Sequence, residues 1–139
     1  MKLDSLISQL ISDEGIRLKP YRDSLGVLSI GIGRNLDDVG ITQDEAMLLL
    51  QNDIRKAYAD LTTALPWVQT LDDVRQNVLI AMTFNMGIGG LLKFKNTLGM
   101  IQRHEYNQAA SAMLQSLWAT QVGARAKRLA DQMRTGSND

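Results

Sequence analysis

The sequence contains no cysteine and a single histidine, His104. The absence of cysteine excludes a disulfide scaffold, thiol catalysis and every metal centre that is bound through cysteine. One histidine cannot form a histidine-rich metal site or a pair of catalytic histidines. These exclusions leave carboxylates as the candidate catalytic groups.

The chain also lacks an excess of charge and has few aromatic residues. Its 139 residues include 15 basic and 15 acidic side chains, and this balance argues against a nucleic-acid partner, although a local basic patch stays open. Aromatic residues make up 5% of the chain and hydrophobic residues 45%. We therefore expect one domain with a core of aliphatic residues and methionine, which favours helices over a β-rich fold.

Long apolar runs are missing as well. Asp4, Ser5, Ser8 and Gln9 interrupt the apolar residues near the N-terminus, so the continuous apolar stretch of a signal peptide is absent there. No stretch reaches the roughly 20 apolar residues that a membrane-spanning helix needs. We expect neither export by a signal peptide nor stable membrane insertion.

The first third of the chain predicts a helix followed by a β-hairpin. The helix is indicated by apolar residues with helical spacing, namely Leu3, Leu6, Ile7, Leu10 and Ile11. It should end at Gly15, which places Glu14 in its last turn. Two apolar segments, 18–21 and 27–32, flank a turn over residues 23–26 and predict the hairpin.

The rest of the chain reads as helical. Thr42 and Glu45 have the spacing of a capping box, and the helix that they begin should run to about Ala64, where Pro66 stops it. Further helices are expected over 71–86, 97–103, 106–118 and 124–134, with a short turn at 91–94.

We interpret this order as an α+β fold that is mostly α. A small N-terminal lobe, about residues 12–60, would hold the hairpin and the long connecting helix. A helical lobe would hold about residues 61–139 together with the N-terminal helix, residues 1–12.

Three polar residues in the N-terminal lobe suggest chemistry. Asp23 follows Glu14 by nine residues, and Ser29 follows Asp23 by six, in the returning strand. Hydrolysis of a glycosidic bond needs one carboxylic acid to protonate the leaving oxygen and a second carboxylate to activate water. A helix C-terminus disfavours negative charge, which suits Glu14 to the role of acid. On spacing alone, solvated surface carboxylates remain the alternative.

The residues around these three carry a resemblance to a known family. The segment from Asp13 to Ser24, followed by Gly26 and by Ser29 to Gly33, is similar to the active-site segment of the phage-type lysozymes, the family of the phage T4 enzyme. The similarity covers essentially the whole chain and continues at residues 41–46, 73–75, 84–87, 94–98, 118, 125–128 and 134–136.

The resemblance implies an endolysin that lyses the host cell. Such an enzyme hydrolyses the β-1,4 bond between N-acetylmuramic acid and N-acetylglucosamine in peptidoglycan, with inversion and without a cofactor or a metal ion. Carried over to this sequence, Glu14 is the general acid and Asp23 activates the water. Ser29 takes the place of the family's usual threonine and helps to hold that water.

The resemblance also implies supporting residues on the C-terminal side. Arg125 would pair with Glu14, and Arg128 would pair with Asp13. Arg34 stands where the family usually has histidine; it can form a salt bridge but cannot titrate near neutral pH.

Phe84, Asn85 and Thr97 are the candidates for substrate binding. Each has an alternative: Phe84 as a core aromatic, Asn85 as a residue that ends a helix, and Thr97 as a helix cap. Trp67 and Trp118 lie in apolar helical stretches, so we expect them in the core rather than stacked on sugars.

The expected partners follow from this family. We expect a monomer that acts on peptidoglycan strands, stays in the host bacterial cytoplasm and reaches the cell wall after a holin-type protein opens the membrane. Arg34, Ser29 and the short segment 35–40 motivate a rival: a weak or inactive peptidoglycan-binding or virion structural module. Lytic transglycosylase chemistry, which uses one acid and no water-activating carboxylate, is a third possibility.

Overall fold

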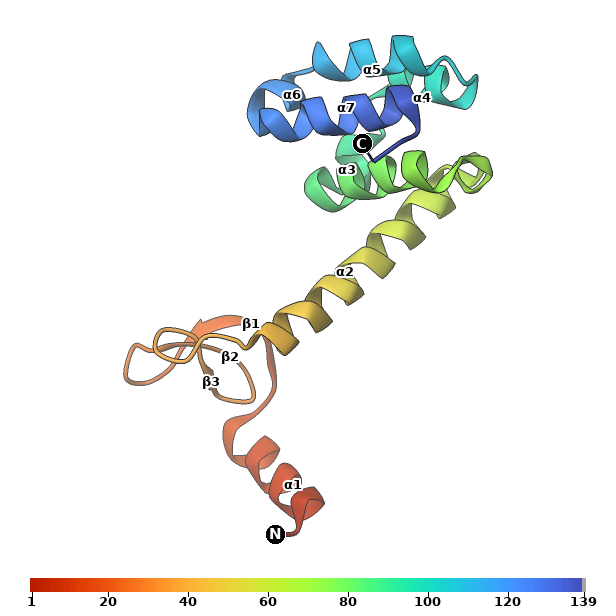
Figure 1. The fold of residues 1–139 in the computed structure, drawn as a ribbon. Helices are drawn as coiled ribbons and strands as arrows, with labels where there is room; N and C mark the ends of the chain where they lie inside the picture. The colour runs from red at the N-terminus through yellow and green to blue at the C-terminus, as the bar shows by residue number, and fades with distance from the viewer. Residues whose placement is uncertain (139) are drawn as a thin grey trace. The chain divides into compact units, whose positions relative to one another are not determined.

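The computed structural model describes residues 1–138, and the chain divides into two compact units, residues 1–49 and the part from residue 50 onward. The described residues form seven α-helices, one 3₁₀ helix and a three-stranded sheet (Figure 1). The prediction of a mostly α-helical α+β fold is therefore confirmed. The division falls inside helix α2, between Leu49 and Leu50.

Helix α1 (Leu3–Glu14) begins the first unit. It ends at Gly15 as predicted, where φ is +74° and the backbone N–H donates to the carbonyl of Ile11 at 2.8 Å. None of its residues is buried, and its apolar face is open: Leu6, Ile7 and Leu10 are 39–43% exposed.

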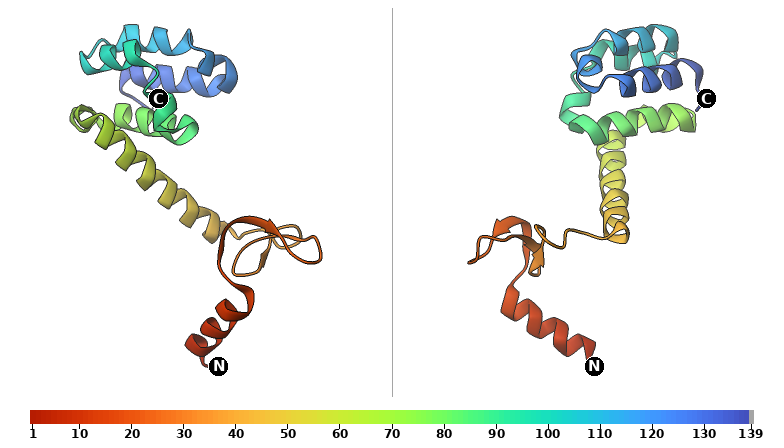
Figure 2. Two further views of the ribbon diagram at one scale, coloured as in Figure 1. Left: turned by 180° about the vertical axis from the view of Figure 1, so that it is seen from behind. Right: turned by 60° about the vertical axis from the view of Figure 1, so that its left-hand side comes forward.

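The sheet follows directly. Its antiparallel strands β1 (Arg17–Arg22), β2 (Leu28–Gly31) and β3 (Arg34–Asn35) lie in sequence order, and Figure 2 shows them from two sides. Ser29 in β2 lies opposite Tyr21 in β1 and opposite Asn35 in β3. The predicted hairpin of β1 and β2 is confirmed, whereas β3 was not predicted because two residues are too few to give a strand pattern.

Helix α2 (Gln43–Ala64) begins with the predicted capping box. The Thr42 hydroxyl accepts the N–H of Glu45 at 3.1 Å, and the Glu45 carboxylate accepts the N–H of Thr42 at 2.9 Å. The helix ends at Ala64 as predicted, and Pro66 starts the 3₁₀ helix η1 (Pro66–Thr70).

Five helices complete the second unit, and Figure 1 shows α5 and α7 side by side. They are α3 (Asp73–Leu91), α4 (Lys95–Gln102), α5 (Tyr106–Leu114), α6 (Leu117–Val122) and α7 (Ala124–Thr135). The end predicted at Gly87 is a break inside α3, where φ is +76°. The single helix predicted over 106–118 is wrong: the Ser116 side chain accepts the N–H of Ala119 at 3.2 Å and starts α6 as a separate helix.

The core of the second unit is aliphatic and rich in methionine, as predicted. Met82, Met113 and Met133 are at most 1% exposed. Trp118 is 6% exposed, and Trp67 is partly buried against the same core, which confirms the core interpretation of both indoles. No helix within residues 1–138 combines the length and the apolar character needed to cross a membrane.

Candidate active site

Asp23 is held in the turn between β1 and β2 by backbone amides. Its Oδ1 accepts the N–H of Leu25 at 2.8 Å and the N–H of Val27 at 2.9 Å. Its own N–H donates to the carbonyl of Val27 at 3.0 Å, and its carbonyl accepts the N–H of Gly26 at 3.0 Å. Asp and Asn favour such turns because their side chains bond to the backbone that follows. Both the position and the orientation of this carboxylate are thereby fixed, although the residue is exposed.

Glu14, the last residue of α1, is also exposed, and its side chain lies against the connection between β2 and β3. The contact is with Gly33: a Cβ at that residue would lie 2.9 Å from Glu14 Oε2 and 3.0 Å from Glu14 Cδ. Asp23 is thus held by hydrogen bonds in a turn of the sheet, and the Glu14 side chain lies beside the same sheet.

Ser29 lies in the middle of that sheet and is 4% exposed. Its hydroxyl donates to the carbonyl of Val27 over a long 3.4 Å, and the oxygen keeps lone pairs that can accept a further hydrogen bond. Its partner across β1 is Tyr21, two residues before Asp23. The strand pairing therefore places Ser29 opposite a residue that lies two positions before Asp23.

Arg34 forms the salt bridge that its sequence position allowed. Its Nη1 donates to Glu45 Oε1 at 2.6 Å and to the carbonyl of Gly40 at 3.2 Å. This hydrogen bond from Arg34, followed by the one from the Thr42 backbone, lowers the pKa of Glu45 to about 2. The same contact raises the pKa of Arg34. Arg34 thus joins the sheet to the capping box of α2.

The predicted supporting pairs stay predictions. Asp13 is an exposed residue of α1 in the first unit, whereas Arg125 and Arg128 are exposed residues of α7 in the second unit. Within residues 50–138, neither arginine forms an ion pair.

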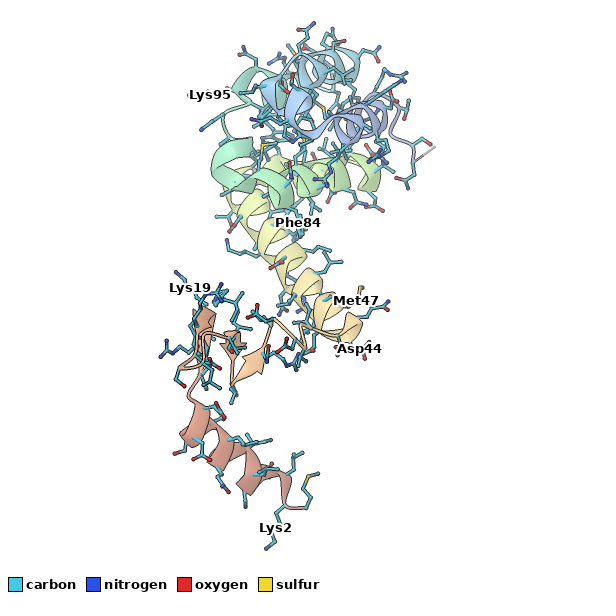
Figure 3. The ribbon with its side chains drawn as sticks, turned by 90° about the vertical axis from the view of Figure 1, so that its left-hand side faces the viewer. Lys2, Lys19, Asp44, Met47, Phe84 and Lys95 are labelled. Atoms are coloured by element: carbon cyan, nitrogen blue, oxygen red, sulfur yellow. The ribbon has the colours of Figure 1, made fainter. Side chains whose placement is uncertain are left out.

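Phe84 and Asn85 are both exposed residues of α3. The Phe84 ring, labelled in Figure 3, is 49% exposed and lines two depressions of about 240 and 510 Å³, and Arg125 also lines the larger one. Asn85 Oδ1 accepts the indole N–H of Trp118 at 2.9 Å. The sequence did not suggest this hydrogen bond. Asn85 therefore satisfies the indole N–H of Trp118, whether or not it also contacts substrate.

Thr97 differs from these two residues. It is 6% exposed and lies in the first turn of α4, after the N-cap residue Phe94, so it does not cap the helix. Its contact with a sugar stays a prediction, and burial leaves the side chain little surface for such a contact.

Within residues 1–138, no three His, Cys, Asp or Glu side chains are grouped so that they could hold a metal ion.

The exposed strand β1 carries positively charged side chains. Arg17 lies 4.6 Å from the ring centroid of Tyr21, and Arg22 Nη1 lies 4.0 Å from Asp37 Oδ2.

Comparison with known proteins gives a consistent result. The chain is 28% identical over 164 residues to "Probable T4-type lysozyme 1" of Dictyostelium discoideum, which covers 97% of this chain and 96% of the relative. It is 30% identical over 161 residues to "Pre-baseplate central spike protein Gp5" of Enterobacteria phage T4, which covers 96% of this chain but 28% of that longer protein.

The family match includes both candidate carboxylates. The model of the family described as phage lysozyme matches residues 12–134, a range that contains Glu14, Asp23 and Ser29 as well as the helices of the second unit. The chain belongs to the phage lysozyme family.

Proposed function

We propose that this protein is a muramidase that hydrolyses the β-1,4 bond between N-acetylmuramic acid and N-acetylglucosamine in peptidoglycan. The observation that carries the proposal is the placement of two carboxylates at one small sheet: Asp23 is held by two backbone N–H groups, and the Glu14 side chain lies beside Gly33. A pair of positioned carboxylates is what glycosidic hydrolysis requires. Membership of the lysozyme family supplies the substrate class.

The two carboxylates take different roles in the proposed reaction. The protonated Glu14 donates its proton to the glycosidic oxygen, and the bond from that oxygen to C1 of N-acetylmuramic acid breaks. Asp23 accepts a proton from a water molecule whose oxygen forms the new bond to C1 from the opposite face of the ring. The products are a hemiacetal of inverted configuration and a free hydroxyl, while Glu14 is left ionised and Asp23 protonated.

Ser29 and the amide-bonded turn support the water step. The Asp23 oxygen that accepts the two N–H groups cannot rotate away without breaking those hydrogen bonds. The Ser29 hydroxyl would help to hold the attacking water. Because serine lacks the methyl group that restricts the χ1 angle of threonine, we expect activity with looser positioning of the water.

The clearance of outer-membrane-permeabilised Gram-negative cells tests the proposal. The wild-type protein should clear the suspension, and Glu14→Gln should lose at least about 100-fold in rate because its amide cannot donate the proton. Asp4→Asn removes a carboxylate from the first turn of the same helix and should keep the wild-type rate. No clearance by the wild type, or equal clearance by Glu14→Gln, would refute the proposal.

The stereochemistry is tested by NMR of the product that forms first. Inversion predicts the α-anomer before mutarotation, whereas a β-anomer would contradict the role assigned to Asp23. A product with a 1,6-anhydro end would instead indicate lytic transglycosylase chemistry.

A second candidate is a peptidoglycan-binding or virion structural module without strong activity. The similarity to the central spike protein favours it, because that relative is named as a pre-baseplate central spike protein. Such a module would sediment with purified cell-wall sacculi equally well as wild type and as Glu14→Gln, and it would release no reducing ends. If the protein is a muramidase, the wild type should release reducing ends and Glu14→Gln should not.

We also propose that the protein acts as a monomer and reaches the wall after a holin-type protein has opened the membrane. Expression in a Gram-negative host should then cause lysis when a membrane-permeabilising protein is co-expressed. Lysis on expression of this chain alone would contradict that dependence.

A further inference from the structure

Gly33 is the residue that the Glu14 carboxylate rests against. A Cβ at residue 33 would lie 2.9 Å from Oε2, 3.0 Å from Cδ and 3.3 Å from Cγ of Glu14. Separations under about 3 Å are too short for a Cβ, so the glutamate could not keep this position beside any residue other than glycine. The hydrogen in place of a side chain is what allows the close approach.

Gly31, the last residue of β2, has no such contact. Gly31 has φ +70°, almost the same as the +71° of Gly33, yet a Cβ at Gly31 would meet no atom within 4 Å. Both residues have a positive φ, a backbone conformation that favours glycine. The two positions therefore differ in the one property of interest, the neighbouring Glu14 side chain.

The side chain would move more easily than the backbone. Glu14 is the exposed last residue of α1, and the atoms that a Cβ at residue 33 would meet are the far end of its flexible side chain. A methyl group at residue 33 would thus rotate the carboxylate away at small cost in stability. The consequence for an acid that must reach the glycosidic oxygen is larger, because misplacement by about 1 Å costs up to about 100-fold in rate.

We propose that Gly33 is a positioning residue that sets the location of the Glu14 carboxylate. It touches no reacting atom and acts through Glu14. Its catalytic consequence rests on the proposed function, whereas the contact itself does not depend on the reaction.

The kinetic test compares Gly33→Ala with Gly31→Ala on soluble glycan fragments. Each variant places an alanine in a left-handed conformation, so both should lower Tm by a similar amount. Gly33→Ala should lose about 10–100-fold in kcat with KM within about twofold, and Gly31→Ala should keep most of its kcat. Equal losses of kcat in the two variants would overturn the proposal.

A second measurement is independent of activity. The chain has three glutamates, Glu14, Glu45 and Glu105, so labelling with glutamate that carries ¹³C at the side-chain carboxyl gives three signals. Glu14→Gln identifies the signal of Glu14. That signal should shift in Gly33→Ala and stay unchanged in Gly31→Ala, with Glu45 and Glu105 as internal references.

The two measurements separate two kinds of failure. An inactive wild type whose Glu14 signal still shifts only in Gly33→Ala would refute the proposed function and support the contact. An unchanged Glu14 signal in Gly33→Ala would overturn the positioning role whatever the activity. If the alanine variants fold poorly, Gly33→Asn and Gly31→Asn repeat the comparison, because asparagine tolerates the left-handed conformation better and also carries a Cβ.

Discussion

Arg34 donates a 2.6 Å hydrogen bond to Glu45 and so ties strand β3 to the first turn of α2. The same Glu45 oxygen accepts the N–H of Thr42, so one carboxylate serves both the salt bridge and the capping box. These contacts lie within the first unit, in which no hydrophobic residue is buried.

This pair predicts a loss of stability in acid. The pKa of Glu45 is lowered from 4.5 to about 2, chiefly by the hydrogen bond from Arg34. A carboxyl whose pKa is lower in the folded state stabilises the fold above its unfolded pKa, and this contribution is lost as the pH falls through the folded pKa. The urea concentration at the midpoint of unfolding should therefore decrease as the pH is lowered from 4.5 to 2.

The matched variants are Arg34→Met and Lys19→Met. The first removes the partner of Glu45 and should flatten part of the slope of stability against pH in that window. The second removes a cation from exposed strand β1, where Lys19 forms no ion pair among the described residues, and should leave the slope unchanged. Equal slopes for wild type and Arg34→Met would show that the pair does not hold Glu45 ionised.

Arg34→His should convert the pair into one that titrates near neutral pH. A histidine paired with a carboxylate has a raised pKa in the folded state, so its contribution is present below about 6.5 and is lost as the pH rises further. The variant should lose Tm between pH 6 and 8 by differential scanning calorimetry, while the wild type stays flat over the same range. A flat profile for the variant would mean that histidine does not reach Glu45.

The sequence predicted those elements whose signals are local. The Thr42 and Glu45 spacing, the stop at Pro66 and the hairpin turn at Asp23 each depend on residues within a few positions of one another, and all three are present. Gly33 belonged to the recognised motif, but its contact with Glu14 joins residues 19 positions apart and depends on the path of the chain between them.

The separate helices α5 and α6 escaped prediction for a related reason. The apolar spacing continues through residues 106–118, but the Ser116 hydroxyl competes for the N–H of Ala119 and ends that continuity. A pattern of apolar residues does not register such competition.

Arg75 links the start of α3 to the end of α7 and should contribute to the stability of the second unit. Its Nε donates to the carbonyl of Met133 at 2.7 Å, and its Nη2 donates to the carbonyl of Arg134 at 3.0 Å, both in the last turn of α7. Its guanidinium also lies 3.5 Å from the ring centroid of Tyr106. Because helix C-terminal carbonyls lack partners within the helix, Arg75→Met should destabilise the protein by about 2–3 kcal/mol in urea unfolding.

Arg103→Met is the control for this effect. Arg103 pairs with Glu105 on the surface, with its side chain 60% exposed, so its loss should change the stability little compared with the loss of Arg75. Similar costs for the two variants would contradict the role of Arg75.

Asn85→Ala should destabilise the fold through Trp118. The variant removes the acceptor of a 2.9 Å hydrogen bond and leaves the N–H of an indole that is 6% exposed without its partner. A cost of about 1–2 kcal/mol in urea unfolding is expected, together with a change in tryptophan fluorescence. If Asn85 also binds glycan, the KM of the variant should rise as well. Unchanged stability would show that the hydrogen bond does not stabilise the fold.

Asp23→Asn tests most directly whether Asp23 activates the water. The asparagine Oδ1 can still accept the N–H groups of Leu25 and Val27, so the turn and the Tm should persist. The amide cannot take a proton from water, so release of reducing ends from purified peptidoglycan should fall at least about 100-fold. A folded Asp23→Asn that keeps the wild-type rate, with 1,6-anhydro ends on its products, would contradict the account.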